Sequence, residues 1–135
     1  MKEIQQNETG KLYAVSYLDD GKFKLRTFSS KQRTSEEIAA DELDINQELG
    51  IDNHTMPINH FPDPFINCCF ISDDLIFVNL FHNASLTHHH FFFTLSTRTL
   101  SGHTKIPIAC NKRNFPQKCF YNKDNEEVYT FYRLG

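Results

Sequence analysis

Apolar and polar residues alternate along two short runs near the start of the chain. Residues 12–18 and 22–28 each place apolar side chains at every second position, and basic side chains lie between them in the second run. A period of two is typical of half-buried β-strands. Asp19-Asp20-Gly21 separates the two runs, and Asp-Gly accepts the positive φ angles of a tight hairpin turn. The pattern therefore predicts a β-hairpin over residues 12–28.

The second half of the chain carries a longer series of short apolar runs separated by turn-forming residues. We expect further strands over residues 65–71, 75–81, 86–95, 100–108, 118–121 and 127–133. Pro107 cannot donate a backbone hydrogen bond, so it indicates that residues 100–108 form an edge strand. With the first hairpin, these runs predict a mainly β fold of antiparallel sheets with about eight strands.

One segment follows a different pattern. Thr34-Ser35 can cap the N-terminus of a helix, acidic residues follow it, and Gly50 can end the helix. The apolar stripe of residues 35–50 is thin, so the segment fits either one short acidic helix or an acidic loop. The three prolines between residues 57 and 64 then exclude a regular helix.

Length and composition agree with a β-rich domain. The chain has 135 residues, which is enough for one hydrophobic core, and it contains 13 Phe and 5 Tyr but no Trp. Phe and Tyr favour pleated, half-buried surfaces. Residues 1–10 are polar, and we expect them to form a flexible N-terminus. Residues 11–135 are then predicted to form a single β-rich domain.

Charge narrows the class of partner. The net charge is −3, whereas a dedicated nucleic-acid binder carries a basic excess. The charge is also uneven, because residues 35–52 contain seven acids and no Lys or Arg, while residues 96–135 contain seven basic residues and three acids. Such a dipolar surface can orient a protein partner.

Two further features bear on the compartment. No apolar run reaches the roughly 18–20 residues of a membrane span, and the N-terminus lacks the apolar core of a signal peptide. We therefore expect an intracellular, cytoplasmic protein. Cys68, Cys69, Cys110 and Cys119 lack Cys-x-x-Cys spacing, so we predict buried free thiols rather than a zinc site. Adjacent Cys68 and Cys69 would point to opposite faces of a strand.

A short internal repeat links distant parts of the chain. Cys69-Phe70-Ile71 recurs as Cys119-Phe120-Tyr121, displaced by 50 residues, and Phe65 and Asp74 match Phe115 and Asp124 at the same displacement. Repeat units would thus start near residues 65 and 115. On these residues the chain resembles blades of the kelch and WD-repeat β-propeller families, although it has neither a Gly-Gly doublet nor a Trp-Asp pair.

The resemblance implies blade-like antiparallel sheets. A propeller needs at least about four blades to close its ring, and this chain is too short for that number. Blade-like units would therefore have to be completed by a protein partner or by further copies of the chain. The alternative is that the sheets pack as a β-sandwich.

His88-His89-His90 is the most conspicuous candidate for chemistry. On a strand His88 and His90 lie on one face about 7 Å apart, a separation at which two imidazoles can hold one metal ion. The pair is similar to the His-x-His metal motif of cupins and carbonic anhydrases, but Thr94 stands where the cupin motif has a Glu. The alternative is that His89 and the alternating Phe residues face the core, while His88 and His90 face solvent or a partner.

The C-terminal strands interleave basic and aromatic side chains. We take them as a partner-binding surface formed by Lys112, Arg113, Phe115, Lys118, Tyr121, Tyr129 and Tyr132. The same pattern could stack on the bases of a single-stranded nucleic acid, which the negative net charge disfavours. No Gly-x-Ser-x-Gly elbow and no Gly-rich phosphate loop occurs. We therefore predict no catalytic residue and no cofactor.

These observations favour one function over two alternatives. The first expectation is a non-enzymatic protein-interaction or structural subunit of a larger intracellular assembly, with a protein partner or self-association. The second is a metal-binding module, or a metal-dependent enzyme, built on His88 and His90. The third is a module that binds single-stranded nucleic acid.

Overall fold

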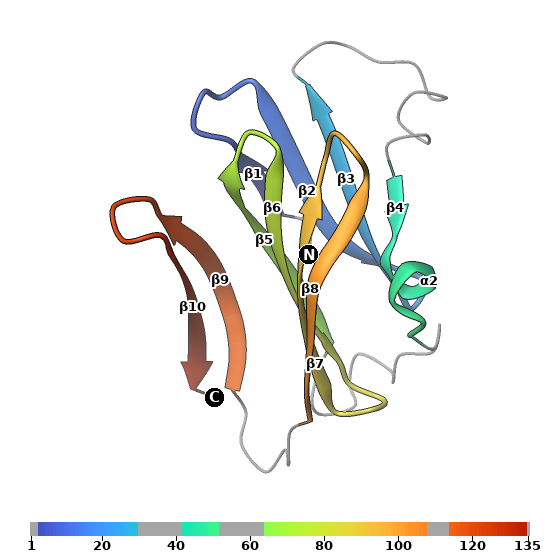
Figure 1. Cartoon of the computed structure of the whole chain (residues 1–135). Helices are drawn as coiled ribbons and strands as arrows, with labels where there is room; N and C mark the ends of the chain where they lie inside the picture. The colour runs from blue at the N-terminus through green and yellow to red at the C-terminus, as the bar shows by residue number, and fades with distance from the viewer. Residues whose placement is uncertain (1–2, 30–41, 52–63, 108–113, 135) are drawn as a thin grey trace.

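The residues that the structure describes form three antiparallel β-sheets and one short helix (Figure 1). This computed structural model describes residues 3–29, 42–51, 64–107 and 114–134. The first sheet has the strand order β1-β2-β3-β4, with bounds Glu3–Gln6, Leu12–Asp19, Lys22–Ser29 and Glu42–Asp44. The central sheet has the order β5-β6-β7-β8, with bounds Phe65–Ser72, Leu75–His82, Thr87–Thr94 and Thr99–Pro107. The C-terminal hairpin pairs β9 (Asn114–Asn122) with β10 (Glu127–Leu134).

The predicted hairpins are present. In the first hairpin Asp19 pairs with Lys22, and the two residues between them have positive φ angles, 49° at Asp20 and 77° at Gly21. This is the geometry that makes Asp-Gly favourable in a two-residue turn. Among the described strands, β8 pairs with β7 alone, so the strand that contains Pro107 lies at an edge, as expected. The mainly β, antiparallel fold class is confirmed.

Two strands were not expected. Sequence analysis assigned no strand to residues 1–10, yet β1 pairs along the edge of β2, with Ile4 opposite Val15. The prediction of a helix or loop was wrong for residues 42–44, which form β4. Leu43 pairs with Leu25 of β3 and is only 7% exposed, so an extended backbone buries its side chain in the core.

The helix is short but ends where predicted. Helix α2 spans Ile45–Leu49, and the side chain of Asp44 caps it by accepting from the backbone N–H of Gln47 at 3.2 Å. Gly50 ends it in the left-handed region at a φ of 67°. The predicted start at Thr34-Ser35 lies outside the described residues. No helix in the described ranges is long and apolar enough to cross a membrane.

The main core lies between the first sheet and the central sheet. Phe23 and Leu25 of β3 face Val78 and Leu80 of β6, together with Phe91 and Phe93 of β7, and none of these side chains is more than 1% exposed. The alternating apolar side chains from which these strands were predicted are the side chains that fill this core. The two sheets stack face to face, as in a β-sandwich.

A second, smaller core lies on the opposite face of the central sheet. Cys69 and Phe77 pack there with Cys119 of the C-terminal hairpin, and Phe92, Tyr121 and Val128 surround them. Cys68 belongs to the main core, so Cys68 and Cys69 point to opposite faces, as predicted. Cys68, Cys69 and Cys119 are buried and form no disulfide, whereas Cys110 lies outside the described residues. The central sheet is therefore the middle of three layers (Figure 1).

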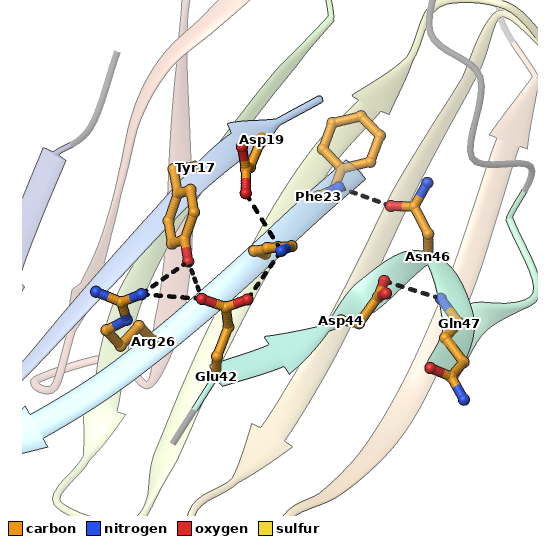
Figure 2. A network of polar contacts seen from close by, with 9 residues as sticks. Tyr17, Asp19, Phe23, Arg26, Glu42, Asp44, Asn46 and Gln47 are labelled. Carbon is orange, nitrogen blue, oxygen red and sulfur yellow. Dashed lines mark hydrogen bonds and ion pairs between the residues drawn. The ribbon is translucent and has the colours of Figure 1, made fainter. Parts of the chain in front are cut away.

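A buried side chain attaches α2 to the first sheet. The amide oxygen of Asn46 accepts a hydrogen bond of 2.7 Å from the backbone N–H of Phe23, and Asn46 is fully buried (Figure 2). Phe23 is the second residue of β3, the return strand of the first hairpin. The helix thus supplies the acceptor that this backbone donor would otherwise lack.

Replacement of Asn46 tests this attachment. Asn46→Ala leaves the buried N–H of Phe23 without its acceptor, so we expect the free energy of unfolding to fall by roughly 1–3 kcal/mol. Urea denaturation measures the change. Gln47→Ala is the matched control, because this neighbouring side chain is exposed and should change stability by less than about 0.5 kcal/mol. Equal effects of the two substitutions would contradict the assignment.

Candidate functional site

A cleft of about 670 Å³ opens where three turns come together. Each turn joins the first strand of a sheet to its second, and Figure 1 shows the three turns at the same end of the molecule, at the upper left. The cleft is lined by the ends of β1, β5 and β9 and by the turns that follow them: Gln6, Glu8, Thr9, Phe70, Ile71, Ser72, Asp73, Phe120, Tyr121, Asn122, Lys123 and Asp124. It therefore belongs to all three sheets at once.

Asn7 holds the first turn against the second. Its side-chain nitrogen donates to Asp73 Oδ1 at 2.8 Å, and its side-chain oxygen accepts from the backbone N–H groups of Lys11 and Leu12, each at 3.0 Å. Asn7 is 6% exposed. A single buried amide thus closes its own turn and connects it to the central sheet.

The third turn is joined to the first by an ion pair. Lys123 Nζ lies 2.7 Å from Glu8 Oε1, and both side chains are largely exposed. The hydrogen bond from Lys123 lowers the pKa of Glu8, and the Lys123 charge adds to this effect; the same hydrogen bond raises the pKa of Lys123. Both groups are charged at neutral pH, although water screens an exposed pair of this kind.

The cleft combines aromatic walls with an acidic rim. Phe120 is 39% exposed, and Phe70, Ile71 and Tyr121 are half-buried. Three carboxylates and one ammonium lie around the opening: Glu8, Asp73, Asp124 and Lys123. The rim is therefore negative overall, while the walls offer apolar surface to a ligand.

Both copies of the sequence repeat line this cleft. Phe70-Ile71 and Phe120-Tyr121 form parts of its wall, and the cysteines that precede them pack behind it in the second core. Of the repeated residues, only Phe115 and Tyr121 were predicted from the sequence to bind a partner, and no cleft was expected there. The repeat was the available signal, because equivalent positions of successive stacked sheets come to lie at the same end.

The predicted partner-binding residues are only partly described. Lys112 and Arg113 lie outside the described residues, and the side chains of Phe115, Lys118 and Tyr132 are not described either. Tyr121 packs inward at the edge of the second core and also lines the cleft. The ring of Tyr129 lies on the outer face of the hairpin, 5.4 Å from that of Phe120. Its hydroxyl donates to Glu127 at 2.8 Å and accepts from Asn125 at 2.6 Å.

His88 and His90 share a face, as predicted, with ring centroids 6.4 Å apart. His88 is only 5% exposed and lies against the rings of Phe65 and Phe81, at 5.5 and 4.9 Å. The expectation that it faces solvent was wrong, because aromatic rings bury this face of β7. Burial, followed by the nearby His90, lowers the pKa of His88 to about 4. The ranges that the structure describes contain no group of three or more potential metal ligands.

His90 faces a second buried polar group. Asn79 lies opposite it in the strand register and is fully buried. Among the described residues, neither polar atom of the Asn79 amide has a hydrogen-bond partner, and the same holds for Nε2 of His90. Two polar side chains therefore lie opposite each other within the central sheet.

His89 points to the other face and meets His103. Their ring nitrogens Nδ1 and Nε2 lie 2.9 Å apart and the rings stack with centroids 5.2 Å apart. Burial lowers the pKa of His89 to about 4, with a further contribution from His103. A neutral imidazole can donate from one nitrogen and accept at the other, so this contact suits two uncharged rings.

A polar network covers the outer face of the first sheet (Figure 2). Glu42 of β4 accepts from the hydroxyl of Tyr17 at 2.5 Å and from Arg26 at 2.9 Å, and it lies 2.9 Å from Lys24. Lys24 also reaches Asp19 at 3.3 Å. These contacts attach the three-residue strand β4 to its neighbours.

The protonation states of this network indicate a structural role. The hydrogen bond from Tyr17 and then that from Lys24 lower the pKa of Glu42 to about 2. Burial and then the hydrogen bond to Glu42 raise the pKa of Tyr17 to about 12. A general acid or base works best with a pKa near the operating pH. The pKa values of Glu42 and Tyr17 lie far from neutrality in opposite directions, so neither group is suited to general acid–base catalysis at neutral pH.

Glu42→Gln tests the polar network. The amide keeps the shape of the side chain but loses the charge that faces Arg26 and Lys24, so we expect a loss of roughly 1–2 kcal/mol at pH 7. The folded-state pKa of Glu42 lies below its unfolded value of 4.5, so its contribution is complete above pH 4.5 and disappears as the pH falls towards 2. Thermal denaturation at several pH values measures both effects. Glu48→Gln on the exposed side of α2 is the control, and an equal loss there would contradict the role of the network.

His88→Phe tests the buried imidazoles. The folded-state pKa of His88 is about 4 and its unfolded value is 6.5, so unfolded chains bind more protons between these limits. Stability should therefore fall as the pH drops from 6.5 to 4, by on the order of 2–3 kcal/mol for this group. Phe keeps the contacts with Phe65 and Phe81 and removes the titration. Chemical denaturation should then show a shallower loss of stability with acid, and an unchanged slope would contradict the burial of a neutral His88.

Comparisons of this chain with protein families, with curated proteins and with solved structures find no match. A functional conclusion for the chain is therefore drawn from its own geometry.

Proposed function

We propose that the chain is a non-enzymatic protein-interaction subunit that assembles through its C-terminal hairpin. The first and central sheets each have four strands, whereas the hairpin has two in the part of the chain that the structure describes. A two-stranded hairpin is only marginally stable alone, and this one packs against the central sheet by a single face. The hairpin is therefore the layer that gains most from added strands.

The free edge of β10 is where strands would be added. Among the described strands β9 and β10 pair only with each other, so the other edge of β10, like that of β9, presents backbone donors and acceptors without strand partners. Such an edge is a template for strand pairing. We propose that β10 of a second copy occupies it, which gives a shared four-stranded sheet on a two-fold axis. Two-fold dimers are the commonest closed assemblies of soluble proteins.

The outer face of the hairpin carries the proposal. Phe120 is 39% exposed and contacts Tyr129 in a tilted arrangement, with the ring centroids 5.4 Å apart. Aromatic side chains are enriched at protein interfaces. The outer face of the first sheet is more polar, because the network of Tyr17, Arg26 and Glu42 covers part of it with paired charges. The hairpin therefore offers the surface better suited to a protein contact.

The stacking of the sheets supports a blade-like interpretation as part of the same proposal. Each sheet is a simple antiparallel meander, consecutive sheets pack face to face, and the ends of β1, β5 and β9 meet at one cleft. Propeller blades share this order and this convergence of their first strands. A plain sandwich accounts for the two-layer core but gives no reason for the convergence.

Tyr129→Lys tests assembly through the hairpin. A charged side chain in an edge strand disfavours strand pairing, so we expect the self-association constant to fall by about tenfold or more. Light scattering and analytical ultracentrifugation over a concentration series measure the change.

Tyr13→Lys is the matched control. Tyr13 stacks on Phe28 with the same ring separation of 5.4 Å, on the first sheet. This substitution should leave association unchanged. A chain that stays a compact monomer at every concentration, or that responds equally to both substitutions, would contradict the proposal. If a different protein binds at the edge of β10, that protein and not a second copy of the chain is the partner.

A further inference from the structure

We propose that the cleft between the three turns binds a basic side chain, preferably an arginine, of a protein ligand. This inference concerns the end of the sheets, whereas the proposed assembly uses the edge of β10; Phe120 lines the cleft and also lies beside Tyr129 on the outer face of the hairpin. The inference is based on the shape of the cleft, its aromatic wall and the charges around its opening.

The cleft has the size and construction of a binding site. Its volume of about 670 Å³ lies within the roughly 300–1,000 Å³ typical of ligand pockets. The turns that form it are held together by the Asn7–Asp73 hydrogen bond and the Lys123–Glu8 ion pair, which joins residues 115 positions apart. Ligand groups would therefore meet a surface whose parts are already positioned relative to one another.

The wall suits the body of an arginine side chain. Arginine buries its aliphatic stem along apolar surface and stacks its planar guanidinium on aromatic rings. Half-buried Phe70, Ile71 and Tyr121 offer the apolar surface, and Phe120, which is 39% exposed, lines the cleft beside them. Contact between a guanidinium and an aromatic ring adds to the attraction of the charged groups.

The rim supplies the charge complementarity. Glu8 is matched by Lys123 at 2.7 Å, so this pair contributes little net charge. Asp73 receives its hydrogen bond from the uncharged amide of Asn7 and forms no ion pair with a described residue, and Asp124 adds a second carboxylate at the opening. A carboxylate accepts bidentate hydrogen bonds from a guanidinium. Two such groups beside an aromatic wall favour an organic cation and repel phosphate.

A metal ion is a weaker occupant of the same site. The carboxylates come from different turns, and no group of three or more potential ligands is close enough to hold an ion in the described part of the chain. Hard cations such as Ca²⁺ require six to eight oxygen ligands. A guanidinium needs fewer oxygen ligands than a metal ion, and it can also pack against the aromatic surface of the cleft, which a metal ion would not contact.

Titration with short peptides tests the inference. The probe is the capped pentapeptide Gly-Gly-Arg-Gly-Gly, compared with the same peptide carrying lysine or the neutral isostere citrulline. Heteronuclear NMR of the full chain should show shifts at Ile71 and Tyr121 with the arginine peptide, weaker shifts with lysine and none with citrulline. Added salt should weaken the binding, because charges near the surface are screened.

Substitutions at the rim locate the site. Asp73→Asn and Asp124→Asn remove charge but keep the size of the side chain, and each should weaken binding of the arginine peptide by about tenfold. Asp20→Asn in the exposed turn of the first hairpin is the matched control and should have no effect. The dispersion of the NMR spectrum shows whether each variant is folded.

Three results would overturn the inference: no shifts with the arginine peptide, equal shifts with citrulline, or unchanged affinity in both rim variants. The test is separable from that of the proposed assembly. Asp73 lies in the turn after β5 and not on the hairpin, so Asp73→Asn should weaken peptide binding and leave self-association unchanged.

Discussion

Burial of both faces of the central sheet is the constraint on which the other elements depend. In β6 every residue after Leu75 is buried, because alternate side chains enter two different cores. Val78 and Leu80 pack towards the first sheet, whereas Phe77 packs towards the C-terminal hairpin. Neither outer layer has a core of its own, so each gains its stability from one face of this sheet. The same sheet holds polar groups of Asn79 and His90 that have no hydrogen-bond partner among the described residues.

Polar side chains then fix how the layers sit against one another. Hydrophobic burial is non-directional and leaves the relative position of stacked sheets loosely specified. Asn46 fixes the position of α2 against the first sheet by accepting from the backbone N–H of Phe23. Asn7 fixes the position of the first turn against the central sheet by donating to Asp73. Both are asparagines with several donors and acceptors, which lets one small side chain satisfy groups from different elements.

The two proposed binding surfaces follow from this stacking in different ways. The cleft exists because the first strands of successive sheets end together, so its wall repeats Phe70-Ile71 as Phe120-Tyr121. The hairpin surface exists because the last described layer has two strands where the others have four, which leaves the edge of β10 open among them. A ligand at the cleft and a partner at the edge would therefore meet different parts of one hairpin, its turn and its outer strand.

The sequence by itself determined the strands, their turns and the antiparallel fold class. Local signals carry this information, such as Asp20-Gly21 for a turn and Gly50 for the end of α2. It did not determine β1 or β4, because those strands exist through pairing with β2 and β3 and not through their own alternation. Only the tertiary structure decided that His88 is buried between Phe65 and Phe81, and that the repeated Phe-Ile and Phe-Tyr pairs line one cleft. Periodicity tells which face a side chain takes, whereas what covers that face depends on residues far away in the chain.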